Sequence, residues 1–404
     1  MTSLANNTLD VKLMSRPILA VLVAQFLSAL ADNALLFAAI ALVKSLATYQ
    51  NWHAPLLQEF FILAFIVFAP FVGPFADSFP KGRVMMLGNG LKFFGAAAML
   101  GGLNPWLAYG LVGLGAAAYS PAKYGILRQL VSTDQLVKAN SLMEGSTIIA
   151  ILLGAVAGGI LADISVQLAL VSITLCYLLA ALSNLLIPRL APEHPLQRTG
   201  LQVLVKDFRL ALSTLYRNRD ARFSLVGTSL FWGSGSTLRF LLVAWVPIAL
   251  LISDNKTPAN LSGVVAVGIA LGALLAARYI TLPTVNRVLY PGLLLGCVVM
   301  ALAFVQDIYT GIVLLVLIGA CGGMFVVPLN ALLQERGHET VGAGHAVAVQ
   351  NFSENIAMLV LVGLYTLIIG TGVSITYVAF GFGVLILFGM LWLYVMRRCT
   401  TNPD

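Results

Sequence analysis

The chain has 404 residues, of which 59% are apolar and only 10% are Asp, Glu, Lys or Arg. Soluble domains carry about 25% charged residues, so this composition excludes a soluble protein of such length. Apolar runs of about 20 residues recur along the whole sequence, which is the pattern of helices that cross a bilayer. We therefore predict an integral membrane protein with almost no soluble part.

Enzyme and cofactor motifs are missing from the sequence. There is no HExxH, GxSxG, GxxxxGK[ST] or GxGxxG pattern in a suitable context. The four cysteines are scattered and none forms a CxxC pair, so they predict neither a metal site nor a disulfide framework. We expect a protein that is not an enzyme and that needs no cofactor and no metal.

Twelve membrane spans are expected, with one long polar connection at residues 189–222. This connection divides the chain into an N-terminal six-helix half, 1–188, a cytoplasmic linker, 189–222, and a C-terminal six-helix half, 223–404. The expected spans are 17–43, 57–77, 84–103, 105–128, 139–161, 166–188, 223–251, 259–279, 286–305, 309–334, 341–369 and 373–396.

The loop cations predict the orientation of these spans. With the N-terminus inside, eighteen of the 23 Lys and Arg residues fall on the cytoplasmic side and only Lys44 and Lys256 fall outside. Such an excess of inside cations is the usual topology signal, so both termini are expected to be cytoplasmic. The net charge of +7 then needs no nucleic acid and favours anionic inner-leaflet lipid.

The two halves resemble each other in sequence. FLSALADNALLF at 26–37 aligns with SLFWGSGSTLRF at 229–240, and YSPAKYGIL at 119–127 aligns with VVPLNALLQ at 326–334. Because each half has an even number of spans, the repeats run in the same direction. Two parallel six-helix halves are the arrangement of the major facilitator fold, so the predicted class is an all-α membrane protein of that fold.

The loop between the second and third spans strengthens this prediction. GPFADSFPKGR at 73–83 resembles the signature of that superfamily, with Gly73, then Asp77, then basic residues that end in Arg83. We interpret it as a conformational latch in which Asp77 lies near a helix N-terminus and Arg83 pairs across the loop. An ordinary tight turn with two topogenic cations is the alternative.

Six charged residues stand out within the spans or at their edges. Each is expensive in hydrocarbon and therefore a candidate functional residue. Three are acidic and three are basic, as pairing requires: Asp32, Lys92, Lys123, Glu144, Arg239 and Glu354.

Two pairs across the halves are expected from these charges. Asp32, which is followed by Asn33, and Arg239 lie in equivalent spans of the two halves, so a salt bridge there would join the halves when they close; a static packing pair is the alternative. Lys123 with Glu354 would be a second pair toward the cytoplasm, unless Lys123 only reaches the interface as an anchor.

The remaining polar candidates are secondary. Gln350 and Asn351 flank Glu354 and predict a polar helix face. Lys92 either lines the N-terminal cavity or reaches the interface, and Glu144 either contacts substrate or acts as a helix-start acid. Three glycines in the fifth span, Gly154, Gly158 and Gly159, predict close helix packing.

Separated acid and base in an otherwise apolar cavity suit a zwitterionic amphiphile. An ammonium pairs with a carboxylate, and a phosphate pairs with Arg or Lys. The residues alone lead to an amphiphile or a hydrophobic cation and no further. They leave open a multidrug exporter of the same fold, in which Asp32 and Glu354 would carry protons, and a lipid scramblase.

Several long stretches resemble the family of bacterial lysophospholipid transporters. They cover nearly the whole chain, and they are 24–38, 68–86, 115–127, 223–242, 326–337 and 341–351. The resemblance implies a carrier in a bacterial inner membrane that moves lysophosphatidylethanolamine and related lysolipids, of which lysophosphatidylglycerol is a candidate, from the outer to the cytoplasmic leaflet. We expect a monomer, although the sequence leaves the oligomeric state and the preference among headgroups open.

The resemblance also implies a partner and a site. An acyltransferase–acyl carrier protein synthetase would re-acylate the lipid inside, and the gating and headgroup residues would be Asp32, Lys123, Arg239 and Glu354. The implied mechanism is alternating access by rocking of the two halves, with sideways entry of the lipid. Whether an ion is coupled to transport stays open.

Overall fold

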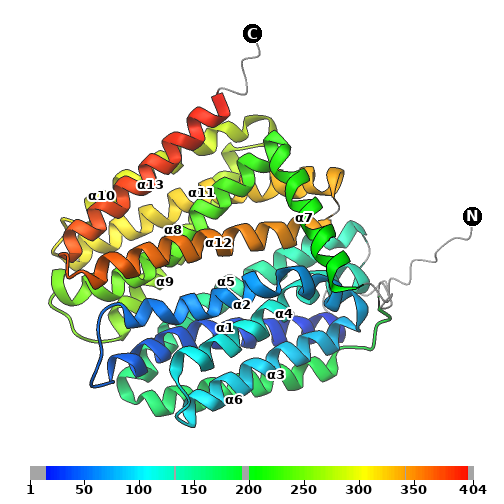
Figure 1. The fold of residues 1–404 in the computed structure, drawn as a ribbon, viewed down its shortest axis with the longest axis horizontal. Coiled ribbons are helices and arrows are strands. Elements are labelled where there is room, and N and C mark those ends of the chain that lie inside the picture. The colour runs from blue at the N-terminus through cyan, green and yellow to red at the C-terminus, as the bar shows by residue number, and fades with distance from the viewer. Residues whose placement is uncertain (1–14, 132, 193–199, 342, 399–404) are drawn as a thin grey trace, which may run out of the picture.

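The computed structural model describes residues 15–131, 133–192, 200–341 and 343–398, and across these ranges it is a bundle of long helices (Figure 1). Nine of the helices in these ranges are long and apolar enough to cross a membrane. The other three long helices, α3, α4 and α8, lie at expected span positions. The all-α class is confirmed, whereas the count of twelve spans stays a prediction.

Two helical groups follow each other along the chain, joined by α7. The first group comprises α1 (Arg16–Lys44), α2 (His53–Ser78), α3 (Lys81–Leu100), α4 (Pro105–Leu130), α5 (Thr133–Ile164), α6 (Val166–Ser183) and the 3₁₀ turn η1 (Asn184–Leu186). The second comprises α8 (Arg219–Ala249), α9 (Lys256–Tyr279), the 3₁₀ helix η2 (Leu282–Val288), α10 (Leu289–Leu302), α11 (Ile308–Thr340), α12 (Ala343–Gly370) and α13 (Ile375–Arg398).

Polar residues at the expected places begin several of these helices. The side chains of Asn104, Ser165, Asn218 and Asp307 accept hydrogen bonds from the first backbone N–H groups of α4, α6, α8 and α11. Such caps satisfy donors that the helix itself leaves unpaired. Between the caps most residues of these segments are apolar, as expected for buried or lipid-facing helices.

The two groups repeat the same packing. Helix α1 packs on α5 and α6 as α8 packs on α12 and α13, and α4 lies against α2 and α3 as α11 lies against α9 and α10. Pro121 and Pro328 lie inside α4 and α11 at the repeat offset predicted from the sequence. These pairings agree with the internal repeat and with two equivalent halves.

The connection between the halves contains a helix that the sequence analysis missed. We expected a polar linker at 189–222, but α7 occupies Leu201–Arg217. Its buried face, Phe208, Ala211 and Leu215, packs against Ala69 of α2 and against α8, α11 and α12. Apolar residues spaced by three and four positions bury one stripe of a helix, and this stripe anchors α7 across one end of both halves (Figure 1).

The halves also meet at the end opposite α7. Both carboxylate oxygens of Asp163, at the end of α5, accept hydrogen bonds from the backbone N–H groups of Asn255 and Lys256 at the start of α9, at 2.8 and 3.0 Å. Trp52, before α2, lies beside Gly370 at the end of α12. The halves are therefore in contact at this opposite end.

The glycines of α5 allow close helix packing, as predicted. A Cβ at Gly154 or Gly158 would overlap the backbone of α1 at Leu30 or Ala34, and one at Gly159 would overlap Ala259 of α9. Small residues permit this approach, so α5 joins α1 of its own half to α9 of the other.

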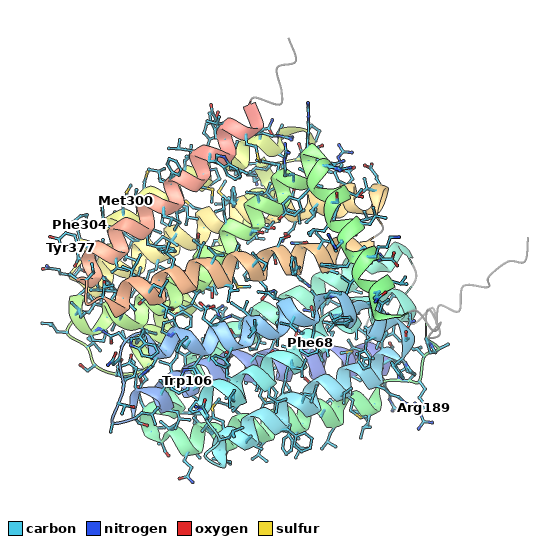
Figure 2. All side chains as sticks on the ribbon, in the orientation of Figure 1. Phe68, Trp106, Arg189, Met300, Phe304 and Tyr377 are labelled. Atoms are coloured by element: carbon cyan, nitrogen blue, oxygen red, sulfur yellow. The ribbon has the colours of Figure 1, made fainter. Side chains whose placement is uncertain are left out.

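The outer surface of the bundle is apolar. Leu186, Leu274, Leu367 and Phe388 are each at least 70% exposed, and exposed apolar side chains in such numbers indicate a lipid-facing surface. Phe304 and Tyr377 project at one end of the bundle, and Arg189 lies at the other, where α7 is found (Figure 2). Aromatic side chains and cations at the ends of spans are typical of membrane interfaces.

Candidate functional site

The carboxylate of Asp32 has its ionic partner in its own half. Lys92 of α3 donates from Nζ to Oδ2 of Asp32 at 2.7 Å, and Tyr177 of α6 donates its hydroxyl to Oδ1 at 2.8 Å. Lys92 is 2% exposed and Asp32 is 26% exposed. One cation and one anion in contact make this group electrically neutral, which lowers the cost of holding it in the membrane.

A chain of hydrogen bonds extends from this pair into the core of the N-terminal half. Lys92 also donates to Oγ of Ser28 at 2.9 Å, and the Ser28 hydroxyl donates to Oδ1 of Asn89 at 2.7 Å. The ammonium lies 5.1 Å from the ring centre of Tyr119 and 5.9 Å from that of Tyr177. These rings add cation–π attraction, so Lys92 is fixed from several sides.

The expected Asp32–Arg239 salt bridge is not formed in this structure. Arg239 is half-buried on α8, and within the described ranges it makes no ion pair or hydrogen bond. Tyr109 of α4 is close enough to feel both the Asp32 and the Arg239 charges. The physical reason is that Lys92, packed in the same half, satisfies Asp32 without any contribution from the other half.

The C-terminal half carries a second polar group around Glu354. Gln350, one turn earlier on α12, donates from Nε2 to Oε1 of Glu354 at 2.8 Å and to Oδ1 of Asn330 on α11 at 2.8 Å. The Thr228 side chain of α8 also faces this carboxylate. Glu354 is only 7% exposed, so an acid sits inside this half with amide and hydroxyl neighbours.

The expected Lys123–Glu354 pair is likewise not formed among the described residues. Lys123 is 8% exposed on α4, so it does not reach out to the interface as a simple anchor either. It lies near enough to Lys92 for the two charges to repel. Lys123 thus adds positive charge to the neighbourhood of the Asp32 group.

The other sequence candidates have more local roles in the structure. Asn33 donates from Nδ2 to the carbonyl of Ala29 within α1 at 2.9 Å, and the carbonyl of Asn351 accepts a bond from Asn355 within α12. The Glu144 side chain lies outside the described part of the chain. These observations place Asn33 and Asn351 beside the polar groups without a contact to either acid.

The structure describes part of the predicted latch. Gly73 lies in α2, Arg83 is exposed, and Lys81 is the buried basic residue, 1% exposed and packed against Gly125 of α4. The side chain of Asp77 lies outside the described residues, so the pairing itself stays a prediction. Lys81 and Arg83 are two positions apart on α3, so they lie on different faces of the helix, one buried and one exposed.

A seventh intramembrane charge, Glu59 of α2, was missed although it falls inside the expected span 57–77. Its Oε1 is buried and has no hydrogen-bond partner within the described residues. It lies close to Gly363 of α12, so it occupies the contact between the halves. In the sequence QEFFILAF, Glu59 is a single acid directly before an apolar run, and this pattern is enough to identify it as an intramembrane charge.

Charged side chains also join three helices at the α7 end. Asp220 of α8 accepts from Arg336 of α11 at 3.0 Å and from Arg397 of α13 at 2.6 Å, and Arg397 also donates to Asn286 at 2.8 Å. Partial burial disfavours the charged form of the Asp220 carboxyl, but the hydrogen bonds from Arg397 and Arg336 stabilise that charged form by more. The pKa of Asp220 therefore lies below its ordinary value.

Metal ligands do not gather in the part of the chain that the structure describes, where no group of three His, Cys, Asp or Glu side chains could hold an ion. The polar groups are instead built from paired charges, amides and hydroxyls. Their arrangement can bind an ionic headgroup by hydrogen bonds and ion pairs.

Comparison with known proteins gives a consistent result at the level of sequence. A family model described as "Major Facilitator Superfamily" matches residues 21–362. A protein of Escherichia coli (strain UTI89 / UPEC) named lysophospholipid transporter LplT is 54% identical over 389 residues, 96% of this chain and 98% of that protein. Proteins of the same name from Shigella boydii serotype 4 and Citrobacter koseri match with the same identity and coverage.

Solved structures with similar folds are transporters. A POT family transporter in complex with 5-aminolevulinic acid has a TM-score of 0.77 at 12% identity, covering 98% of this chain and 99% of that chain. The nucleoside transporter NupG has a TM-score of 0.70 at 11% identity, covering 93% of this chain and 98% of that chain. At such low identity these likenesses support the fold alone.

Proposed function

Because the chain belongs to the major facilitator superfamily, we propose that it is a lysophospholipid transporter and not an enzyme. The observation that carries this proposal is the 54% identity, over 96% of the chain, to proteins named lysophospholipid transporter. The site chemistry supports it, since charges of both signs lie within helices whose remaining surface is apolar. A molecule with a zwitterionic head and one acyl chain suits such a path.

We assign the headgroup contacts to the charges that have no ionic partner within the described residues. Arg239 would bind the phosphate, because a guanidinium matches phosphate geometry, and Glu354 would bind the ammonium of ethanolamine. Asp32, Asn33 and Lys123 would gate the passage. Asp32, held by Lys92 at 2.7 Å, would exchange partners when the halves move, and Gly73, Asp77 and Arg83 would serve as the conformational latch.

The proposed mechanism is alternating access. The halves would be the bundles 1–188 and 223–404, joined by the linker 189–222. The end opposite α7, closed by Asp163 against α9, would be the outer face of a bacterial inner membrane, with both termini cytoplasmic. Lysophosphatidylethanolamine, and also lysophosphatidylglycerol, would enter sideways and leave toward the cytoplasmic leaflet.

The cellular context would be lipid repair. An acyltransferase–acyl carrier protein synthetase would consume the lipid inside, which would keep transport running in one direction without an ion gradient. We expect a monomer, because the proposed path lies within one chain. One acyl chain needs less apolar surface than two, which would exclude diacyl lipids.

Reconstituted protein tests the proposal. Proteoliposomes should move fluorescent lysophosphatidylethanolamine between leaflets faster than protein-free vesicles, and a diacyl phosphatidylethanolamine should neither move nor compete. Equal movement of both lipids would indicate a scramblase, and movement of neither would refute the function.

A further inference from the structure

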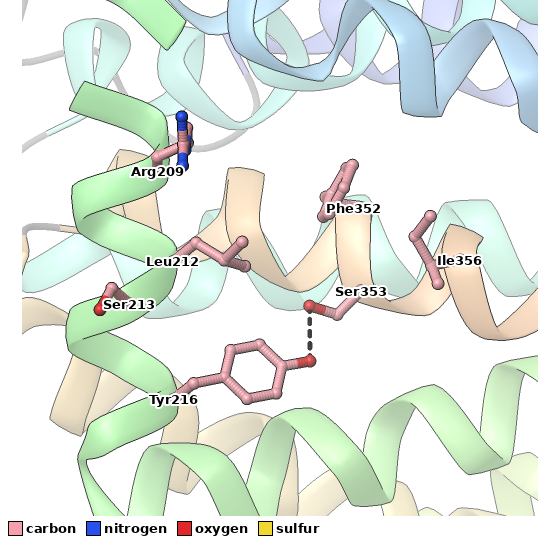
Figure 3. A pocket seen from close by; sticks show the side chains of 7 residues that line it. All are labelled: Arg209, Leu212, Ser213, Tyr216, Phe352, Ser353 and Ile356. Atoms are coloured by element: carbon pink, nitrogen blue, oxygen red, sulfur yellow. Dashed lines mark hydrogen bonds between the residues drawn. The ribbon is translucent and has the colours of Figure 1, made fainter. Parts of the chain in front are cut away.

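A cavity lies between α7 and α12, beside the segment of α12 that carries Glu354. Its volume is about 380 Å³, within the range of about 300–1,000 Å³ for small-molecule sites. Figure 3 shows the lining side chains, which come from one face of α7 and one face of α12: Arg209, Leu212, Ser213, Tyr216, Phe352, Ser353 and Ile356.

The cavity has a cationic mouth. Arg209 is exposed on α7, and no ion pair or hydrogen bond holds its guanidinium among the described residues. A second, adjoining cavity shares Arg209 and adds Lys206, which lies one turn earlier. Two cations one turn apart on a helix face suit a phosphate, which Arg binds through paired N–H donors.

The apolar part of the lining comes from both helices. Leu212 lies on α7, and Phe352 and Ile356 lie on α12. In the same cavity the Tyr216 hydroxyl donates to Oγ of Ser353 at 3.1 Å (Figure 3). Ser353 directly precedes Glu354, the acid of the C-terminal half, so the cavity lies beside the segment of α12 that carries this acid.

We propose that this cavity is the exit site of the transported lipid. The phosphate of a lysophospholipid would bind Arg209 and Lys206, the hydroxyl of Ser213 would donate to it, and its single acyl chain would lie on Leu212, Phe352 and Ile356. The proposal rests on the proposed function and deepens it. It adds a second phosphate site beyond Arg239, on the helix that joins the halves.

Photolabelling of the full chain in proteoliposomes tests the exit site. The probe is lysophosphatidylethanolamine with a diazirine in its acyl chain, and adducts are mapped by mass spectrometry. In the wild type, adducts should lie on α7 and α12 at the cavity-lining residues. Arg209→Gln should lower their yield about fivefold, the size of one solvent-accessible ion pair.

The matched control is Arg217→Gln, which removes the same charge from an exposed position of α7 that does not line the cavity. It should leave the adduct yield unchanged. Unlabelled lysophosphatidylethanolamine should displace the probe, whereas a monoacylglycerol, which lacks phosphate, and inorganic phosphate, which lacks the chain, should not.

Three results would overturn the exit site: equal yields in the two variants, wild-type adducts only elsewhere, or displacement by diacyl phosphatidylglycerol as efficient as by the lysolipid. The last would make the cavity a surface site for bulk anionic lipid. Transport by the wild type, measured in the same vesicles, separates these results from failure of the proposed function, in which no lysolipid would move at all.

Discussion

The two halves treat their intramembrane charges in opposite ways. In the N-terminal half, Asp32 and Lys92 are in contact, and the hydroxyl of Tyr177 donates a hydrogen bond to the second carboxylate oxygen of Asp32. In the C-terminal half, Glu354 has only amide and hydroxyl neighbours, and Arg239 has no ionic partner in the described ranges. Asp32 and Lys92 thus neutralise each other in one half, whereas Glu354 and Arg239 stay apart in the other.

This difference bears on which half receives the headgroup. A charge already paired at 2.7 Å must lose its partner before it can bind a ligand, which costs several kcal/mol when both charges are buried. A charge without an ionic partner gains energy from the ligand directly. We therefore expect the C-terminal half to bind the headgroup and the Asp32 group of the N-terminal half to act in gating.

The largest expected effect follows from removing one member of the neutral pair. Lys92→Met would leave Asp32 without its cation, and breaking a fully buried pair costs about 3–5 kcal/mol; because Asp32 is 26% exposed, we expect the lower end of this range. We expect a matching loss in the free energy of unfolding in detergent micelles.

The double variant Asp32→Asn, Lys92→Met removes both charges and should recover most of that stability. Lys256→Met, at a side chain that is 55% exposed, is the matched control and should change stability by less than about 1 kcal/mol. If the double variant were as unstable as Lys92→Met alone, the contact at 2.7 Å would not be the source of the effect.

The next effect concerns transport and the C-terminal half. Arg239→Gln removes a cation that no described partner neutralises, so folding should be preserved. The rate of lysophospholipid transport should fall about 10- to 100-fold, as expected for one lost charge-assisted hydrogen bond of about 1.5–3 kcal/mol. Initial rates in proteoliposomes measure it.

Two companion variants sharpen this result. Arg239→Lys keeps the charge but loses the planar pair of donors, and it should lie between the wild type and Arg239→Gln. Arg278→Gln removes an exposed cation at the end of α9 and should transport normally. Unchanged transport by Arg239→Gln would place the phosphate elsewhere.

The helices and their repeat could be predicted from the sequence because apolar length and loop charge act locally. The ionic partners of the charged residues within the spans could not be predicted in this way. Asp32 and Arg239 occupy equivalent spans, and equivalence indicates symmetry rather than contact. Lys92 lies among glycines that let α3 approach α4 at Gly115. Packing within one half places it beside Asp32, and the spacing of residues in the sequence does not reveal such packing.

Two omissions have different causes. Helix α7 carries a stripe of apolar residues at helical spacing, ending in Leu215, but it was hidden by the polar composition of the linker. Glu59 was overlooked in an apolar run. The periodicity of apolar residues is enough to predict α7, and a count of charged residues within the spans is enough to find Glu59. Both features could therefore be predicted from the sequence, whereas the pairing of Lys92 with Asp32 could not.

A smaller effect compares hydroxyls in the two halves. Tyr177 donates to the Asp32 carboxylate at 2.8 Å, whereas Tyr365 donates to the backbone carbonyl of Phe240 at 3.1 Å. Hydrogen bonds to charged groups contribute about 1.5–3 kcal/mol and neutral ones about 0.5–1.5. Tyr177→Phe should therefore lower the free energy of unfolding more than Tyr365→Phe. Equal losses would mean that Lys92 alone satisfies Asp32.

The smallest effect depends on pH and on the Asp220 group at the α7 end. Its two arginine partners lower the pKa of Asp220 in the folded protein, so the folded state releases this proton more readily than the unfolded state. The resulting stability is present above the ordinary carboxyl pKa of about 4. It is lost as the pH falls through the lower folded value.

Asp220→Asn removes this contribution at every pH. At pH 7 it should cost about 1 kcal/mol, the upper range for partly exposed ion pairs, and the difference from the wild type should shrink as the pH is lowered toward 3. Asp254→Asn is the control, since the Asp254 carboxylate lies 4.0 Å from an exposed lysine and should show a smaller difference. A difference that stayed constant between pH 7 and pH 3 would mean that Asp220 holds α8, α11 and α13 by shape and not by charge.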